Sequence, residues 1–158
     1  MSDPYAWLKL VHIVSATVLF GTGLGTAFQM WMANRTGDVR AIAAVAGSVV
    51  TADYLFTTPS VIIQPASGVA LIWVAGYDPF SAWLVVTYLL YGLAGACWVP
   101  VVVIQVRIRD VARDCVAAGQ ELPPEYRRLM ARWTVLGIPA FSAVLITFWL
   151  MVTKPALW

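Results

Sequence analysis

Residues 7–28, WLKLVHIVSATVLFGTGLGTAF, form a long apolar run in which Lys9 and His12 are the only ionisable side chains. An α-helix rises about 1.5 Å per residue, so a run of this length crosses the roughly 30 Å hydrocarbon core of a bilayer. The stretch therefore predicts a membrane-spanning helix, which we expect over residues 5–33. A single imidazole inside such a helix requires an explanation, because ionisable side chains are costly in lipid.

The composition of the whole chain agrees with this reading. Of its 158 residues, 61% are hydrophobic and 11% are charged, whereas soluble domains carry about 25% charged residues. The mean hydropathy is +0.79. An integral membrane protein is indicated, and the length suits one bundle of about four spanning helices. Cys97 and Cys115 lie too far apart along one helix to form a disulfide, which excludes a disulfide framework.

Apolar runs separated by turn-forming segments predict an all-α fold, a four-transmembrane-helix bundle in a single domain covering residues 1–158. The separating segments are NRTGD, GYDPFS and AGQELPPE. We expect spans over residues 5–33, 54–76, 82–106 and 133–152, with an extra helical segment over 39–52. The second span contains two prolines, which remove backbone donors and predict a kink.

The basic residues predict the orientation of the bundle. Arg35 and Arg40 lie in the first connection, and six arginines lie in the third, residues 107–132, whereas the second connection has no Lys or Arg. By the positive-inside rule the first and third connections are cytoplasmic and both termini are outside. We interpret residues 107–132 as a solvated basic loop or as a docking surface for a soluble partner. The aromatic residues expected at the inner interface are Trp31, Tyr54, Tyr126 and Trp133.

Polar side chains recur at a spacing of three or four residues along the first three spans. Because polar groups in hydrocarbon must find partners, we expect these stripes to face inward and toward each other. They serve either as hydrogen-bonding contacts between helices or as a functional seam. The stripes comprise His12, Ser15, Thr22, Thr26 and Gln29; Asp53, Thr57, Ser60, Gln64 and Ser67; and Ser81, Tyr88, Tyr91, Gly95, Trp98, Gln105 and Arg109.

His12 is the only histidine of the chain, so two histidine ligands to one haem are excluded within the chain. It could ligate a haem iron, carry protons or hydrogen-bond across the seam. A dedicated metal site is not predicted, because no cluster of Cys, His or carboxylate ligands accompanies it. In the haem interpretation Met151 is the methionine at similar depth, and Lys9 and Lys154 pair with propionates. The pocket would be shaped by Ser15, Gly21, Gln64, Tyr88 and Tyr91.

Three further features admit two interpretations each. Asp53 forms a structural ion pair with Arg35 or Arg109, or joins Gln64 and His12 in a proton relay or transport path. The Gly21-x-x-x-Gly25 motif allows close helix approach, within this chain or in a homodimer, and we favour the former. The prolines of TTPSVIIQPASG, residues 57–68, open a ligand cavity or only bend the helix for packing.

The stretches WLKLVHIVSATVLFGTGLGTAF, FTTPSVIIQPASG and RWTVLGIPAFSAVLITFWLMVTKP resemble a bacterial family of predicted integral membrane proteins, domain of unknown function 2269. The resemblance covers nearly the whole chain. It implies a four-helix, multi-pass protein of the bacterial inner membrane, and it implies no particular activity.

WLKLVHIVSATVLFGTGL is also similar to the first helix of the bacterial four-helix, haem-binding protoporphyrinogen IX oxidase. That resemblance implies that His12 binds haem, and Pro59 and Gly68 match the second helix of that family. Thr87 stands where that family has a functional lysine, so protoporphyrinogen oxidation itself is not implied. We expect a haem b protein acting in electron transfer or as a membrane oxidoreductase. The alternatives are a non-catalytic membrane subunit and a small transporter or proton relay.

Overall fold

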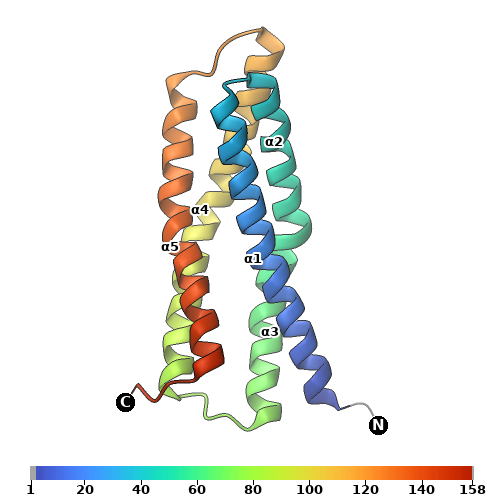
Figure 1. Ribbon diagram of the computed structural model, residues 1–158, viewed down its shortest axis with the longest axis vertical. Coiled ribbons are helices and arrows are strands. Elements are labelled where there is room, and N and C mark those ends of the chain that lie inside the picture. Colours follow the sequence, from blue (N-terminus) through green and yellow to red (C-terminus); the bar gives the residue numbers. More distant parts are fainter. Residues whose placement is uncertain (1–2, 158) are drawn as a thin grey trace.

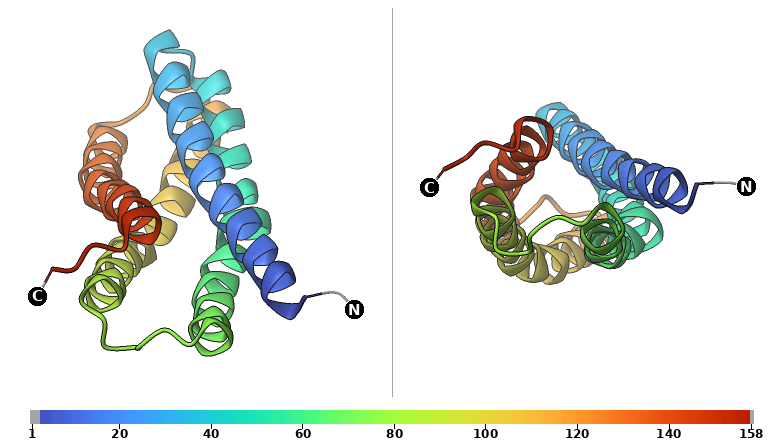
Figure 2. Two further views of the ribbon diagram at one scale, coloured as in Figure 1. Left: turned by 60° about the horizontal axis from the view of Figure 1, so that its bottom comes forward. Right: turned by 90° about the horizontal axis from the view of Figure 1, so that it is seen from below.

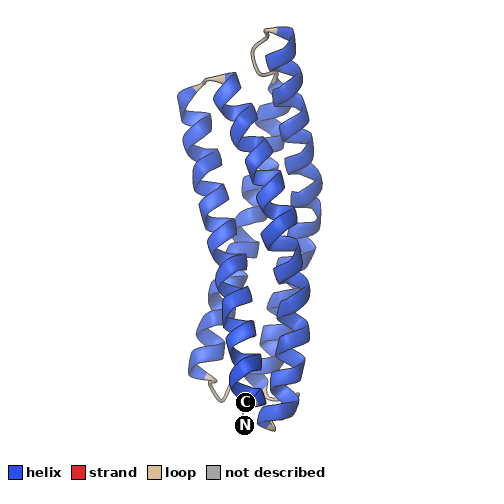
Figure 3. Ribbon diagram, turned by 90° about the vertical axis from the view of Figure 1, so that its right-hand side faces the viewer, coloured by secondary structure: helices blue, strands red, loops and turns tan. Residues whose placement is uncertain are grey.

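The structure is a computed structural model that describes residues 3–157. It is a bundle of helices, and no strand occurs within those residues (Figures 1 and 3). The predicted all-α fold is confirmed, and four helical stretches are long and apolar enough to cross a membrane. The elements are α1 (Pro4–Thr36), α2 (Val39–Ala52), η1 (Asp53–Thr57), α3 (Thr58–Ala75), α4 (Ala82–Ala118) and α5 (Pro124–Thr153).

The ends of the helices follow local chemistry. Asp38 caps α2, because its carboxylate accepts a hydrogen bond of 2.8 Å from the backbone N–H of Arg40. Gly37 and Gly119 end α1 and α4 in left-handed conformations, with φ of 69° and 64°. Glycine adopts this conformation without the steric cost that a Cβ brings. These short turns make α1 antiparallel to α2 and α4 antiparallel to α5, and both termini lie at the same end of the bundle, as predicted (Figure 1).

The second span is longer than predicted, because α2, η1 and α3 form one continuous helical stretch, Val39–Ala75. Its middle turn, Asp53–Thr57, is π-helical. Pro59, two residues after this turn ends, has no N–H to offer to the preceding turn. Single π-turns widen a helix locally and often occur at functional sites. This turn buries the side chains of Asp53 and Thr57, each 8% exposed, inside the bundle.

A second proline lies within α3 and is compensated from α4. Pro65 cannot donate to the carbonyl of Val61, four residues earlier. The hydroxyl of Tyr91 on α4 donates a hydrogen bond to that same carbonyl. The backbone acceptor that Pro65 leaves free is therefore paired by a specific contact between α3 and α4.

The four spans pack as neighbours around a central axis (Figure 2). Helix α1 packs on α2 and α3, and α4 packs on α2 and α5. One apolar core lies near the end opposite the termini and includes Ile42, Ala46, Ile108 and Ala112. A smaller core near the termini consists of Trp83, Leu84 and Leu150. The candidate site lies between these two cores.

The prediction of a loop over residues 107–132 is wrong. Helix α4 continues to Ala118 and α5 begins at Pro124, so only 119–123 lie outside helices. The stretch is charged, but most of its residues favour helix. The charged residues therefore mark the end of the apolar span, while the helix itself continues. Arg107 and Glu125 join the two helical extensions through a contact of 3.0 Å.

Candidate functional site

A hydrogen-bonded network joins α1 to α3 in the half of the bundle nearer the termini. Nδ1 of His12 lies 2.8 Å from the hydroxyl of Ser67. The side-chain amide of Gln64 donates to the carbonyl of His12, at 2.7 Å, and to the hydroxyl of Ser15, at 2.6 Å. The polar stripes of the first two spans therefore face each other, as predicted.

The hydrogen bonds of Ser67 favour one tautomer of His12. The hydroxyl of Ser67 lies 2.7 Å from the carbonyl of Ile63, and when it donates there it acts as an acceptor toward the imidazole. In that arrangement Nδ1 of His12 carries the proton and Nε2 has the lone pair. The ring packs on Gly68, where an added Cβ would lie 3.4 Å from its Cε1. His12 is thus held by a hydrogen bond and by packing.

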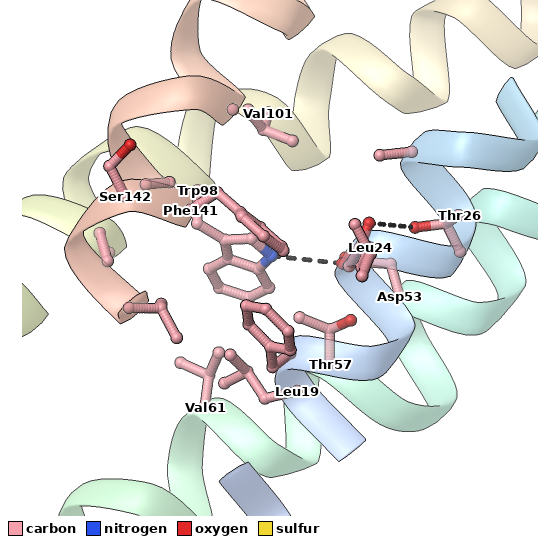
Figure 4. Close-up of a pocket in the computed structure, with 18 of the residues that line it drawn as sticks. Leu19, Leu24, Thr26, Asp53, Thr57, Val61, Trp98, Val101, Phe141 and Ser142 are labelled. Carbon is pink, nitrogen blue, oxygen red and sulfur yellow. Dashed lines mark hydrogen bonds between the residues drawn. The ribbon is translucent and has the colours of Figure 1, made fainter. Parts of the chain in front are cut away.

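A cavity of about 490 Å³ lies between α1, the η1–α3 stretch, α4 and α5 (Figure 4). Most of its wall is apolar, and six aromatic side chains contribute to it. Helix α1 reaches α5 through the ring of Phe20, which stacks on Phe141 with ring centroids 4.6 Å apart and contacts Phe148 at 5.5 Å. The aromatic lining consists of Phe20, Tyr91, Trp98, Trp133, Phe141 and Phe148.

One end of this cavity is polar. Asp53 and Gln105 are 8% and 5% exposed, and the indole N–H of Trp98 donates to Oδ1 of Asp53 at 3.2 Å (Figure 4). The side chains of Thr57 and Gln105 also hydrogen-bond the Asp53 carboxyl. Three side-chain atoms of residues that line the cavity are buried away from its open space and, among residues 3–157, have no well-aligned hydrogen-bond partner: Oδ2 of Asp53, Nε2 of Gln105 and Nε1 of Trp133. We call these three side chains the polar end of the cavity. Buried polar atoms are almost always paired in native proteins, so this group requires an explanation.

The chain matches one protein family over nearly its whole length. Residues 6–155 match the family described as predicted integral membrane protein (DUF2269). The chain belongs to this family. No curated protein and no solved structure matches it. The membership confirms the family resemblance, and the bundle described above is a structure of a DUF2269 member.

Sequence reasoning gave a wrong partner for Asp53 in this DUF2269 protein. We predicted an ion pair with Arg35 or Arg109, but Arg109 contacts Asp110 at 2.8 Å. Arg35 lies over the ring of Trp31, 5.0 Å from its centroid. The Asp53 carboxyl lies inside the bundle, on the stripe where regular spacing placed it, and it meets Trp98 instead of an arginine.

The residues proposed for a haem pocket do not form one group in the structure. Gln64 and Tyr91 line the cavity, whereas His12 and Ser15 belong to the α1–α3 network. Tyr88 lies on the surface of the bundle and is 45% exposed.

The other four proposed residues lie apart from that network. Met151 packs on the small core near the termini. Lys9 lies over the ring of Tyr5, 5.6 Å from its centroid, and Lys154 hydrogen-bonds the hydroxyl of Tyr77. At Gly21, a Cβ would meet no atom of another described helix within 4 Å.

The expected close approach of another helix of this chain at Gly21 and Gly25 is also wrong. Within the part of the chain that the structure describes, both glycines face open space. Gly23, between them, is the one that faces α5, with an added Cβ 3.8 Å from the ring of Phe141. The sequence revealed the glycine motif, but it did not reveal which face of α1 contacts α5.

Trp133 was missed as a site residue. The sequence places it at the start of an apolar span, where a tryptophan is typical of the membrane interface. In the structure α5 begins at Pro124, before the predicted span, so Trp133 lies well inside the helix and its side chain lines the cavity. Gln105 and Trp98 were predicted to lie on the polar stripe of the third span, and both line the cavity.

Within residues 3–157, no three His, Cys, Asp or Glu side chains lie together as a metal site.

Proposed function

We propose that this protein binds a lipophilic small molecule in the central cavity of its membrane bundle. The observation that carries the proposal is the cavity itself, an apolar space of about 490 Å³ lined by six aromatic side chains and enclosed by helices of the bundle. An empty apolar space of this size forfeits the dispersion contacts that a filled one makes. A ligand with an apolar body restores these contacts and fills the cavity.

The dimensions of the cavity support a binding function. Its volume of about 490 Å³ lies within the roughly 300–1,000 Å³ that is typical of small-molecule sites. Such sites are mostly apolar, with a few polar groups that orient the ligand. The contact of Phe20 with Phe141 between α1 and α5 lies beside this cavity, so a lipophilic ligand reaches it from the bilayer when these rings separate.

Filling the cavity tests this proposal. Gly95 and Gly137 line it, and a Cβ at either position meets no described atom within 4 Å, so leucine projects into the cavity without a backbone clash. Gly21→Leu and Gly25→Leu are matched controls, because these glycines are also open but lie outside the lining. Native mass spectrometry of the detergent-purified protein should show a retained small molecule in the wild type and in both controls. Gly95→Leu and Gly137→Leu should lose it. Retention by all four variants would refute the proposal.

A second candidate function, binding of haem b through His12, is favoured by the contact of that residue with Ser67. Iron-ligating histidines commonly donate their other ring N–H to a neighbouring group, which orients the ring. The hydroxyl of Ser67, 2.8 Å from Nδ1, is a group that accepts such a bond in the tautomer that leaves Nε2 with its lone pair. His12 would then serve as one axial ligand, and a bound haem would supply one-electron chemistry for an oxidoreductase or electron-transfer role.

The haem proposal is tested by the reduced-minus-oxidised absorbance spectrum of protein purified with haem supplied. We expect a Soret band that is absent in His12→Ala and altered in Ser67→Ala, since the serine only positions the ring. A flat wild-type spectrum with an intact fold would eliminate this candidate. It would leave the cavity proposal standing, because His12 does not line the cavity.

We further propose that the protein lies in the bacterial inner membrane with its arginine-rich end in the cytoplasm and both termini outside. The six arginines of residues 107–132 gather at the end opposite the termini, which supports this orientation (Figure 1). The expected protein partners, a second copy of the chain or a redox subunit, stay predictions.

A further inference from the structure

The cavity opens to the surface of the bundle between α1 and α5. Leu24 on α1 and Ile138 on α5 both line the cavity, yet their side chains are 51% and 63% exposed. These two residues therefore stand at its rim, one on each helix. Helix α1 packs mainly on α2 and α3, so only side chains bridge the gap between α1 and α5. We call this gap the lateral window.

Two contacts between α1 and α5 bound the lateral window. On the side of the termini, the ring of Phe20 stacks on Phe141. At the opposite end, the hydroxyl of Tyr126 donates a hydrogen bond of 2.8 Å to Oδ1 of Asn34. The helical rise between Phe20 and Asn34 is about 21 Å. The window is therefore elongated and runs along the bundle, which is also the direction of the acyl chains in a bilayer.

Two arginines flank the hydrogen bond that closes the far end of the window. Arg35 and Arg127 each directly follow one of its two residues, and both side chains are exposed. Arg35 lies about three helical turns from Leu24, so the two share one face of α1. Arg127 lies about three turns from Ile138 and shares its face of α5 in the same way. Each rim of the window therefore ends in an arginine, about 16 Å along the helix from the exposed rim residue.

Both arginines are available to bind an anion. Among residues 3–157, neither forms an ion pair with an acidic side chain. Arg35 lies over the ring of Trp31, and tryptophan is typical of the membrane–water interface. Within the described part of the chain, no Lys, Arg or His lines the cavity. The site thus combines a largely apolar chamber with two cations at the outer end of its window.

From this arrangement, and resting on the proposed binding function, we infer that the ligand is an anionic phospholipid of the surrounding bilayer. One acyl chain enters the cavity through the lateral window, and the phosphate binds between Arg35 and Arg127. The rise of about 16 Å from the arginines to Leu24 and Ile138 matches the roughly 15 Å that one leaflet contributes to the hydrocarbon core. A phospholipid with its headgroup at the level of the arginines therefore has chains that reach the rim of the cavity.

The negative charge of the headgroup follows from the two guanidinium groups. Each presents a planar fork of N–H donors that matches the oxygens of a phosphate. A zwitterionic headgroup brings a positive charge beside the two arginines, and an uncharged lipid offers them no anion. A free fatty acid also carries an anion, but the phospholipids of the leaflet are already held at this depth and in this orientation.

Photolabelling in lipid nanodiscs locates the chain and measures the preference for the headgroup. The probe is phosphatidylglycerol with a diazirine near the end of one acyl chain, at trace level in phosphatidylcholine. Label should appear on Trp98 and Phe141, which line the cavity and are only partly exposed. Added phosphatidylglycerol should displace this label about 5- to 25-fold more effectively than added phosphatidylcholine with the same chains, because each basic residue at a membrane surface contributes about fivefold.

Three arginine substitutions test the site of the phosphate. Arg35→Gln and Arg127→Gln should each lower the preference for phosphatidylglycerol about three- to fivefold. Arg132→Gln is the matched control, because it removes the same charge from another face of α5, and it should change the preference less than twofold. All three side chains are exposed, so we expect the variants to fold. Equal losses in Arg127→Gln and Arg132→Gln would reduce the effect to general surface charge and overturn the inference.

The remaining outcomes separate this inference from the proposed function. If Gly137→Leu removes the label from Trp98 and Phe141 but the two phospholipids compete equally in the wild type, the cavity binds a chain and the headgroup inference is wrong. Displacement by oleate at lower concentrations than phosphatidylglycerol assigns the site to a free fatty acid and also overturns it. If Gly137→Leu and the control Gly21→Leu are labelled like the wild type, the proposed function itself fails.

Discussion

Replacing Tyr91 by phenylalanine tests whether its hydroxyl compensates for Pro65. The hydroxyl donates to the carbonyl of Val61, which the proline leaves without its helical donor. Hydrogen bonds between membrane helices average about 0.6 kcal/mol and reach about 1.7. Here the alternative is an unpaired carbonyl, which costs about 1–3 kcal/mol. We therefore expect Tyr91→Phe to lower the free energy of unfolding by about 1–2 kcal/mol, near the upper limit for such bonds.

A double-mutant cycle isolates the cause of that loss. In the Pro65→Ala background, the backbone N–H of residue 65 is available to the Val61 carbonyl, so Tyr91→Phe should cost less than about 0.5 kcal/mol. Unfolding is followed by circular dichroism in mixed micelles with increasing denaturing detergent. Tyr88→Phe is the control, since the described residues offer its hydroxyl no hydrogen bond and its side chain is 45% exposed. Equal costs of Tyr91→Phe in the two backgrounds would refute the compensation.

Three other substitutions give direct expectations. Trp98→Phe should destabilise the fold by about 1–3 kcal/mol in the same unfolding assay, because it removes the indole donor to the Asp53 carboxyl. An unchanged unfolding midpoint would contradict this hydrogen bond. Gly47→Ala should stabilise the bundle by about 0.5–1 kcal/mol, since a glycine in the middle of a helix is unfavourable. The new Cβ meets only the end of the flexible Arg113 side chain, at 3.1 Å. A clear loss of stability would show that this arginine cannot move. Phe20→Ala should speed exchange of a bound apolar probe, nonylbenzene, about 2- to 10-fold in a stopped-flow competition, because aromatic contacts worth about 0.5–1.5 kcal/mol are lost. An unchanged rate would place the entrance elsewhere.

The sequence was sufficient for the architecture because bilayer thickness constrains it so strongly. Apolar length, turn residues and arginine placement predicted four spans, and the helix over residues 39–52 appears as α2 with those bounds. The bounds of the apolar spans did not predict where the helices end. Hydropathy reports contact with lipid, whereas helix continuity depends on backbone hydrogen bonds and propensity, so the charged extensions of α4 and α5 were missed.

The candidate site was predictable only in part, and the reason is geometric. Regular spacing brought Ser15, Gln64 and His12 to the correct faces, because those stretches are ordinary α-helix. Asp53 was expected just outside the span over residues 54–76, within reach of an arginine, but it lies inside the continuous stretch Val39–Ala75, so the arginine partner was wrong. For Trp133 the sequence contained no usable signal, since an interfacial tryptophan and a cavity-lining one look alike in an apolar run.

The bundle consists of two unlike halves, and the cavity lies between them. Helices α1 and α3 are joined by side-chain hydrogen bonds, whereas α4 and α5 pack along each other. Asp53 belongs to the first half, and Trp98, whose indole donates to it, belongs to the second. A ligand that fills the cavity contacts both halves. Binding would therefore stabilise the association of the two halves, because the ligand's contacts are lost when they separate.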